Sequence, residues 1–319
     1  MPSACFYPIS LTKKANPPIS KHMHKPEHLV IRPPSEARSL LLRVVRGCNW
    51  NRCRFCGIYD LFETPYSLRS LDEVLKDIDA LAATYGDIFK TAFIGDANPL
   101  DLDTDFLVTV LTHLREKFPR VERITSYARA SSLQKKSAGD LLAIHEAGLD
   151  RVHVGLESGS NKVLKFQMKG TSQKQLIEAG NKAMESGLEL SYYFLSGLGG
   201  QNLWEEHARE SAHVFTRVKP HFIRIRRLFI HPASTLMEKV RSGEFTQQTP
   251  EGTVLELRML LENIDAEGST FTCDHANNFL PVHGTLNGEK AEMLGMIDKF
   301  LALPKSRRME HYNSVPSVI

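Results

Sequence analysis

The feature that most constrains this chain is a regular alternation between short apolar runs and amphipathic segments, which begins at Leu40. The apolar runs are rich in β-branched and aromatic residues, a composition typical of buried strands. The amphipathic segments are long enough to be helices, and helical connections join parallel strands. We therefore predict an α/β fold with a parallel sheet of six strands, over residues 40–45, 91–95, 123–127, 151–156, 190–195 and 222–230.

The intervening helices are indicated by their periodicity and by their capping residues. Ser70 and Glu73 have capping-box spacing at the start of the first helix, and Gly86 ends it. Six strands are too few for a complete eight-stranded barrel, so we expect a partial (β/α)6 TIM-like barrel. The predicted helices span residues 70–86, 103–118, 137–148, 172–187 and 203–218.

The two ends of the chain differ from this core, which spans residues 39–232. Residues 1–38 are rich in proline, and we expect an extended or partly disordered N-terminal extension. The alternation fades after residue 232, so residues 233–319 are expected to form a C-terminal cap of mixed structure over one end of the sheet. The cap has helical patterns at 253–264 and 288–303, with a loop and a short strand at 271–284.

Three of the five cysteines, Cys48, Cys53 and Cys56, follow the first predicted strand with the spacing C-x4-C-x2-C. A structural zinc site takes four ligands, and the downstream Cys273 has no CxxC partner, so zinc would need a histidine. A [4Fe–4S] cluster normally takes four thiolates. With three, one iron keeps an open position for a substrate or cofactor. The loop suits this role, because parallel α/β folds place their chemistry at the carboxyl ends of strands.

Composition is that of an ordinary globular protein, with 42% hydrophobic and 24% charged residues. The net charge of +3 is too close to zero to indicate binding to nucleic acid or to an anionic membrane. The sequence shows neither an apolar run of transmembrane length nor a signal-peptide core, so we expect a cytoplasmic protein. Thiols stay reduced there, and clustered cysteines more often bind metal or perform chemistry than form disulfides.

The cysteine loop resembles that of the radical S-adenosylmethionine (SAM) superfamily, whose usual pattern is C-x3-C-x2-C with an aromatic residue before the last cysteine. Phe55 takes the aromatic place, and this chain has one more residue between its first two cysteines. Three further segments are similar to motifs of the coproporphyrinogen dehydrogenase-like and methylthiotransferase-like branches, and they lie at successive strand ends. They are FIGDANPL (93–100), VGLESGSNKVLKFQMKGTS (154–172) and FLSGLGGQN (194–202).

The resemblance implies a [4Fe–4S] cluster held by Cys48, Cys53 and Cys56, with SAM bound at the open iron. It also implies a set of SAM-binding residues at the strand ends. These are Phe55, Ile58 and Gly197 near the adenine, Glu157 at the nucleoside, Lys169 at the methionine carboxylate, and the backbone of Gly95, Asp96 and Ala97 at the methionine amino group. For Lys169, an ordinary solvated position is the alternative.

The activity that the resemblance implies is reductive cleavage of SAM, followed by abstraction of a hydrogen atom from a small organic substrate. A flavodoxin or ferredoxin would supply the electron, and neither a membrane nor a nucleic acid is an expected partner. The alternative is a non-catalytic iron–sulfur electron carrier or cluster scaffold, which would need neither Glu157 nor Lys169. The catalytic residues that act on the substrate are unknown at this stage.

Several polar residues bear on the choice of substrate. Arg129, after the third strand, would bind SAM or a substrate carboxylate, or else form a surface salt bridge. Arg224 and Arg226 alternate onto one face of the sixth strand. That face is either the barrel lumen, which would suit an acidic substrate, or a solvated outer face. The polar segment 273–275 lies in the cap, where substrate-specific residues are expected, although a lone thiol such as Cys273 is more often a small buried hydrophobe.

Overall fold

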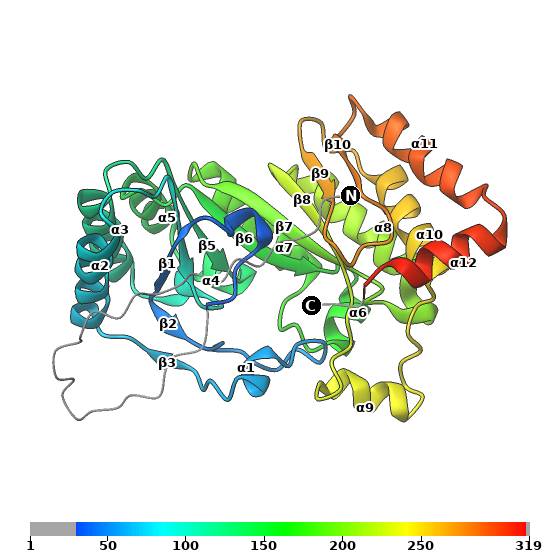
Figure 1. The fold of residues 1–319 in the computed structure, drawn as a ribbon, viewed down its shortest axis with the longest axis horizontal. Helices are drawn as coiled ribbons and strands as arrows, with labels where there is room; N and C mark the ends of the chain where they lie inside the picture. Colours follow the sequence, from blue (N-terminus) through cyan, green and yellow to red (C-terminus); the bar gives the residue numbers. More distant parts are fainter. Residues whose placement is uncertain (1–29, 317–319) are drawn as a thin grey trace, which may run out of the picture.

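The computed structural model describes residues 30–316, and these are built around one sheet of eight strands (Figure 1). Neighbouring strands from β1 to β9 pair in parallel, and β10 pairs antiparallel with β9 at the edge. The six predicted strands are all present, and the α/β class is confirmed. In sheet order the strands are β1 (Leu40–Arg43), β4 (Thr91–Gly95), β5 (Arg123–Ala128), β6 (Arg151–Glu157), β7 (Glu189–Ser196), β8 (Phe222–Arg227), β9 (Thr270–Cys273) and β10 (Val282–Thr285).

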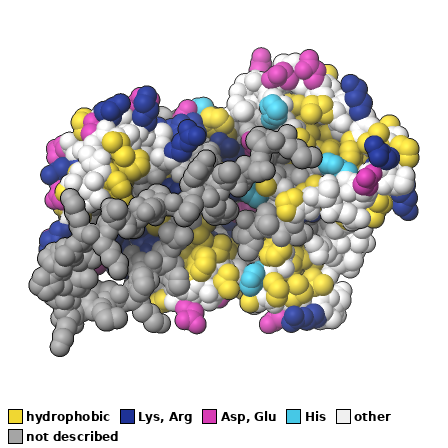
Figure 2. Space-filling view, in the orientation of Figure 1, with side chains coloured by type: hydrophobic (Ala, Val, Ile, Leu, Met, Phe, Trp, Pro, Cys, Tyr) yellow, Lys and Arg dark blue, Asp and Glu magenta, His cyan; other side chains and the backbone are white. Residues whose placement is uncertain are grey.

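Helices connect the strands and cover one face of the sheet (Figure 1). Ser70 caps the first long helix in the expected capping box with Glu73, which satisfies two backbone N–H groups at the helix start. On this helical layer, basic and acidic side chains are interspersed over the surface seen at the left of Figure 2. The long helices are α2 (Leu71–Tyr85), α3 (Thr104–Lys117), α5 (Ala138–Glu146), α7 (Gln173–Glu185), α8 (Gly200–Val218), α10 (Pro250–Asn263), α11 (Lys290–Leu301) and α12 (Lys305–Ser314).

Shorter elements lie at the strand ends and were mostly not expected from the sequence. Residues 40–45 do not form one strand, because Val45 and Arg46 leave the main sheet after β1 and pair with a second short strand. Among the described residues, no helix is both long and apolar enough to cross a membrane. The short elements are η1 (Pro34–Glu36), β2 (Val45–Arg46), α1 (Ile58–Leu61), β3 (Ser67–Leu68), η2 (Pro99–Asp101), α4 (Ala130–Lys135), α6 (Asn161–Phe166) and α9 (Thr235–Arg241).

The helix-covered face of the sheet carries the hydrophobic core. Val154, Tyr192, Phe194 and Ile223 each alternate onto this face and are completely buried. The Tyr192 hydroxyl donates to the carbonyl of Leu176 in α7 at 2.5 Å, so its one polar atom is satisfied within the core. Burial of each such side chain contributes roughly 1.5–3 kcal/mol, which accounts for the attachment of the helices to the sheet.

The opposite face of the sheet, which we call the lumen face, is aromatic and polar instead. Four rings from the neighbouring strands β4 to β7 form a row across it. Ring centroids lie 5.0 Å apart for Phe93 and Tyr127, 6.1 Å apart for Tyr127 and His153, and 5.8 Å apart for His153 and Tyr193. Edge-to-face contacts of this kind hold flat rings in fixed positions, so the row gives the lumen a rigid wall.

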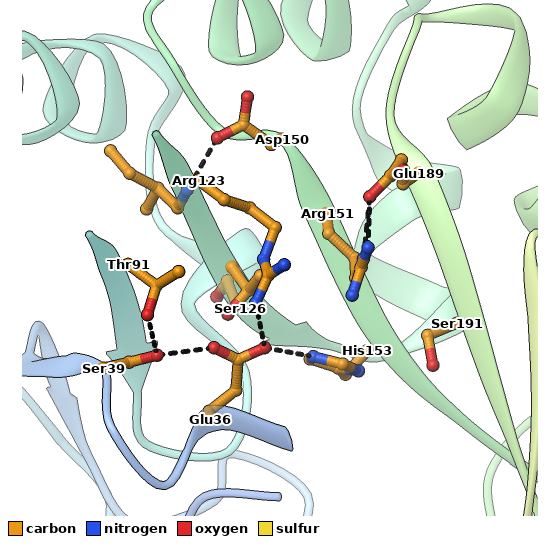
Figure 3. Close-up of polar contacts among 12 residues, drawn as sticks. Glu36, Ser39, Thr91, Arg123, Ser126, Asp150, Arg151, His153, Glu189 and Ser191 are labelled. Atoms are coloured by element: carbon orange, nitrogen blue, oxygen red, sulfur yellow. Dashed lines mark hydrogen bonds and ion pairs between the residues drawn. The ribbon is translucent and has the colours of Figure 1, made fainter. Parts of the chain in front are cut away.

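The amino ends of the strands are closed by η1, whose Glu36 is fully buried (Figure 3). Its carboxylate accepts a hydrogen bond from Ser39 Oγ at 2.7 Å and lies 3.4 Å from His153 Nε2 and 3.6 Å from Arg123. Burial alone would raise the pKa of Glu36, but these partners outweigh it and hold the pKa below its ordinary value. Residues 34–36 therefore form a short helix that closes the amino ends of the strands, and the expectation of an extended or partly disordered segment is wrong for these three residues. Most of the predicted extension 1–38 lies outside the described residues.

The residues after 232, predicted as a cap, also extend the sheet. β9 pairs in parallel with β8, and α10 packs against α8, so this region continues the same α/β arrangement. The sequence indicated only a loop and a short strand at 271–284, because β9 and β10 have four residues each and show little periodicity. The predicted boundary at residue 232 remains a prediction.

Candidate functional site

The base of the cysteine loop is fixed to the carboxyl end of β4. The Asp96 carboxylate accepts a hydrogen bond from Gly47 N–H at 3.1 Å and forms an ion pair with Arg43 at 3.2 Å. Asp96 N–H donates to the carbonyl of Val45, and Val44 N–H donates to the carbonyl of Gly95. Asp96 is almost completely buried, so its carboxylate charge depends on these partners, and their contacts fix the base of the loop.

The far side of the loop is fixed to the segment that follows α6. Arg54 N–H donates to the carbonyl of Gln167 at 3.0 Å, and Trp50 Nε1–H donates to the carbonyl of Met168 at 2.8 Å. Gly170 has φ +71°, and a Cβ atom there would overlap the Trp50 ring. Both the backbone conformation and the close approach therefore require glycine.

A buried amide, Asn98, connects the loop to β5 and α4. Its Nδ2 donates to Asn49 Oδ1 at 3.2 Å and to Ser132 Oγ at 2.8 Å, and its Oδ1 accepts from Arg129 N–H at 3.0 Å. Asn49 in turn donates to Asp101 at 2.6 Å. Sequence reasoning quoted Asn98 only as part of the FIGDANPL motif. Its position directly after the glycine turn was the one signal that could have identified it.

The three thiols of Cys48, Cys53 and Cys56 are partly buried, and none of them forms a disulfide. Burial raises the pKa of Cys53, and it raises the pKa of Cys56 to about 11. Among the described side chains, no three metal-binding groups gather around one point as a single ion would require. An iron–sulfur cluster places each thiolate on a different iron, and binding to iron deprotonates buried thiols. The donor set of three thiols on one loop therefore fits a cluster.

Glu157 and Lys169, predicted at different parts of SAM, form an ion pair with each other beside the cysteines. Lys169 Nζ lies 3.0 Å from Glu157 Oε1, and the two side chains are only 12% and 16% exposed. Burial by itself lowers the pKa of Lys169, but Glu157 and Cys53 outweigh it and raise the pKa above its ordinary value. The surface alternative for Lys169 is thus excluded, because its side chain is enclosed.

Two backbone features at the end of β6 make room for this pair. The strand register shifts between Gly155 and Glu157, and Glu157 takes a left-handed conformation with φ +62°. A Cβ atom at Gly155 would overlap Glu157 Oε1 and lie 2.8 Å from Lys169 Nζ. The glycine in the GLESG motif thus provides the space in which the ion pair sits.

A cavity of about 240 Å³ adjoins the last cysteine. Phe55, Cys56, Ile58, Leu195 and Arg226 are among its lining residues, so two predicted adenine contacts share one space with a predicted cluster ligand. A neighbouring cavity of about 610 Å³ includes Gly197. The walls of the first cavity are largely apolar, which suits a flat, weakly polar ring system.

The remaining predicted residues are divided between the site and the core. Arg129 stacks on Trp50, 4.8 Å from the ring centroid, and donates to the carbonyl of Lys169 at 2.9 Å, so it belongs to the loop's supports. Ala97 is half-buried at the turn after β4. Cys273 lies in the hydrophobic core, and burial raises its pKa, so it is an inert thiol.

Comparison with known proteins agrees with this geometry. Residues 42–212, more than half of the chain, match the Radical SAM superfamily. The chain is 21% identical to the heme chaperone HemW of Bacillus subtilis over 221 residues, which cover 68% of this chain and 57% of that protein. Across three curated relatives, the matched part spans between 23% and 57% of the relative's length.

Two solved structures share the fold. Coproporphyrinogen III oxidase HemN from Escherichia coli aligns with a TM-score of 0.55 and 16% identity, covering 72% of this chain and 54% of that chain. The methyltransferase TsrM from Kitasatospora setae, solved with cobalamin and a [4Fe–4S] cluster, aligns with a TM-score of 0.51 and 21% identity, covering 66% of this chain and 38% of that chain. Since the matched segment contains the cysteine loop and every strand from the end of β1 to β7, this chain belongs to the Radical SAM superfamily, whose members use a [4Fe–4S] cluster and SAM.

Proposed function

We propose that this enzyme cleaves SAM reductively and abstracts a hydrogen atom from a small organic substrate. The observation that carries the proposal is the apolar cavity beside Cys56, which lies at the carboxyl ends of parallel strands and adjoins the lumen. When bound, the two cofactors supply one-electron cleavage of SAM and a carbon radical that removes the hydrogen atom. The part of this chain is to hold the cofactors, orient the substrate and exclude water.

Cys48, Cys53 and Cys56 would hold the cluster. Phe55 and Ile58 would bind the adenine of SAM, since both line the cavity that Cys56 borders. Gly197, in the turn after β7, lines the neighbouring cavity and would contact the adenine from there. These contacts are apolar or come from the backbone. They suit adenine because an uncharged base needs no charged side chain to bind it.

Glu157 and Lys169 would bind the polar parts of SAM. Both side chains are largely enclosed, and their mutual ion pair fixes their positions before SAM arrives. Lys169 suits the methionine carboxylate because its charge is favoured by the site. The carbonyls of Gly95, Asp96 and Ala97 would accept from the methionine amino group, while the Asp96 carboxylate remains with Arg43.

A small reductant such as a flavodoxin or ferredoxin would supply the electron. Asn51 and Arg52, at the tip of the cysteine loop, are exposed, so a partner can approach the cluster from outside the barrel. A non-catalytic carrier or scaffold would have no use for an enclosed ion pair and an apolar cavity beside its cluster, which disfavours that alternative.

The test is anaerobic reconstitution of the full chain with iron and sulfide, followed by incubation with SAM and dithionite. We expect 5′-deoxyadenosine, detected by mass spectrometry, in amounts that depend on SAM. The matched control is Cys53→Ala, which should form none. An intact cluster with bound SAM and no 5′-deoxyadenosine would contradict the proposal and favour the carrier.

A further inference from the structure

A second cavity, of about 400 Å³, lies in the lumen and is not used by any contact assigned above to SAM. One wall is formed by η1, and the other comes from β7, β8 and β9 and the loop that follows β9. Arg226 and His275 line both this cavity and the cavity beside Cys56, so the two spaces meet at these side chains. Besides Ser35 of η1, the polar or charged lining residues are Tyr193, Arg224, Arg226, Thr272, Asp274 and His275.

Arg226 is the group in this cavity with the least compensation for its charge. Within residues 30–316, its guanidinium has neither a hydrogen bond nor an ion pair, and it lies over the Tyr193 ring, 5.9 Å from the ring centroid. It is partly buried, and burial lowers its pKa. Removing a guanidinium from water without a counter-ion costs free energy. An anion bound in the cavity would offset that cost.

The Tyr193 hydroxyl is a second polar group without a partner. Its oxygen is buried and has no hydrogen bond among the described residues. Burial raises the pKa of Tyr193 to about 12, so the hydroxyl keeps its proton and can donate. Buried hydroxyls in proteins are nearly always hydrogen-bonded, and one beside an unpaired guanidinium is suited to an acceptor that the cavity receives from outside.

The charges around the cavity distinguish between kinds of anion. Arg224 donates to Ser191 Oγ at 3.1 Å and has no ion pair, so it adds a second positive charge. Asp274 lines the same cavity without an ion pair to either arginine, and it offsets one of them. Two further acids act electrostatically on Tyr193, and both are paired, Glu157 with Lys169 and Glu36 with Arg123. One positive charge is left, which matches a single carboxylate better than a phosphate dianion.

We propose that the lumen cavity binds the carboxylate of an organic acid substrate, with Arg226 and the Tyr193 hydroxyl as its recognition groups. The inference rests on the proposed function in one respect, that the molecule bound here is the substrate. Since Arg226 lines both cavities, an acid held there would extend directly towards the space beside Cys56. Arg226 is thus a specificity-determining residue.

The experiment compares an acid with its neutral amide on the full chain, reconstituted anaerobically with SAM and without reductant. The probes are 4-phenylbutyrate and 4-phenylbutyramide, which are similar in shape, and their dissociation constants are measured by isothermal titration calorimetry. We expect the acid to bind wild type at least about tenfold more tightly than the amide, since charge-assisted hydrogen bonds are the strong ones. In Arg226→Gln this preference should vanish, and in Arg226→Lys it should be partly retained.

The matched control is Arg217→Gln, which removes the same charge from an exposed position on α8 and should keep the wild-type preference. The preference is the ratio of the dissociation constants of the two probes for the same protein. A general loss of stability would weaken both probes alike and leave this ratio unchanged. A preference that survives in Arg226→Gln, the absence of binding by both probes to wild type, or displacement of the acid by equimolar inorganic phosphate would each overturn the inference. Because no reductant is present, binding is scored even if the enzyme forms no 5′-deoxyadenosine, so the two proposals fail separately.

Discussion

The buried carboxyl of Glu256 in α10 provides a sharp test of how the turn after β7 is held. Glu256 Oε1 accepts hydrogen bonds from Gly197 N–H at 2.7 Å and from Ser196 Oγ at 2.8 Å. Its Oε2 has no partner among the described residues. Burial raises the pKa of Glu256 from 4.5 to about 8 because the two hydrogen bonds do not replace the hydration of a full charge.

This raised pKa makes stability depend on pH. The folded chain keeps the Glu256 proton up to about pH 8, whereas the unfolded chain releases it near pH 4.5. The stabilisation from this proton is therefore complete below pH 4.5 and is lost as the pH rises towards 8. At 1.36 kcal/mol for each pKa unit, the loss between pH 5 and pH 8 is roughly 3 to 4 kcal/mol. The nearby His207, whose pKa burial lowers from 6.5 to about 3, contributes with the opposite sign, because below its ordinary pKa only the unfolded chain protonates this histidine. That contribution is present in wild type and in a Glu256 variant alike, so a comparison of the two isolates Glu256.

The measurement is urea unfolding of wild type and Glu256→Gln between pH 5 and pH 8. The amide oxygen of glutamine can accept the same two hydrogen bonds but does not titrate. We expect similar free energies of unfolding at pH 5 and a more stable variant at pH 8. Glu267→Gln, at an exposed position before β9, should follow wild type at every pH. Parallel curves for wild type and Glu256→Gln would refute the assignment of a raised pKa to this carboxyl.

Three other substitutions test the site. Cys53→Ala should remove both the brown absorbance of the cluster and SAM cleavage, while circular dichroism still shows a folded chain. The control Cys273→Ala, in the core, should keep the cluster. A brown Cys53→Ala protein would contradict the ligand assignment. Glu157→Ala should weaken SAM binding about tenfold in equilibrium dialysis without loss of iron, and unchanged affinity would count against its role. Gly155→Ala should displace Glu157 and Lys169 and lower the free energy of unfolding by roughly 1–3 kcal/mol, measured in urea, and a variant as stable as wild type would show that the ion pair can move aside.

The parts of the fold that could be predicted are those that depend on local pattern. The six predicted strands of the main sheet carry apolar residues on the face that the helices cover, and the capping box at Ser70 needs only residues three positions apart. For β9 and β10 the sequence indicated only one short strand within 271–284, because segments of four residues such as TFTC are too short to show a period. η1 was not predicted because its buried Glu36 lies within a proline-rich segment, and such a composition indicates an extended, exposed segment.

The parts of the site that escaped prediction depend on distant contacts. Sequence reasoning identified Glu157 and Lys169 but assigned each a separate partner on SAM, since their pairing needs the register shift after Gly155. Glu256 lies in a helix whose charged residues mostly face solvent, and it becomes a buried support only because α10 packs on α8 and reaches β7. Asn98 likewise acquires its role through partners in the cysteine loop and at the start of α4, both distant from it in sequence.

The division of the lumen explains why chemistry and specificity are separable in this chain. The matched family segment, 42–212, contains the cysteine loop and the Glu157–Lys169 pair. On that side Glu36 of η1 lies buried at the amino ends of the strands. The lumen cavity is lined by Tyr193 of β7, which belongs to the matched segment, and otherwise by residues of η1, β8, β9 and 274–276, which lie outside it. Cofactor chemistry can therefore be shared across the superfamily, while the residues that face the lumen cavity are free to select the substrate of this protein.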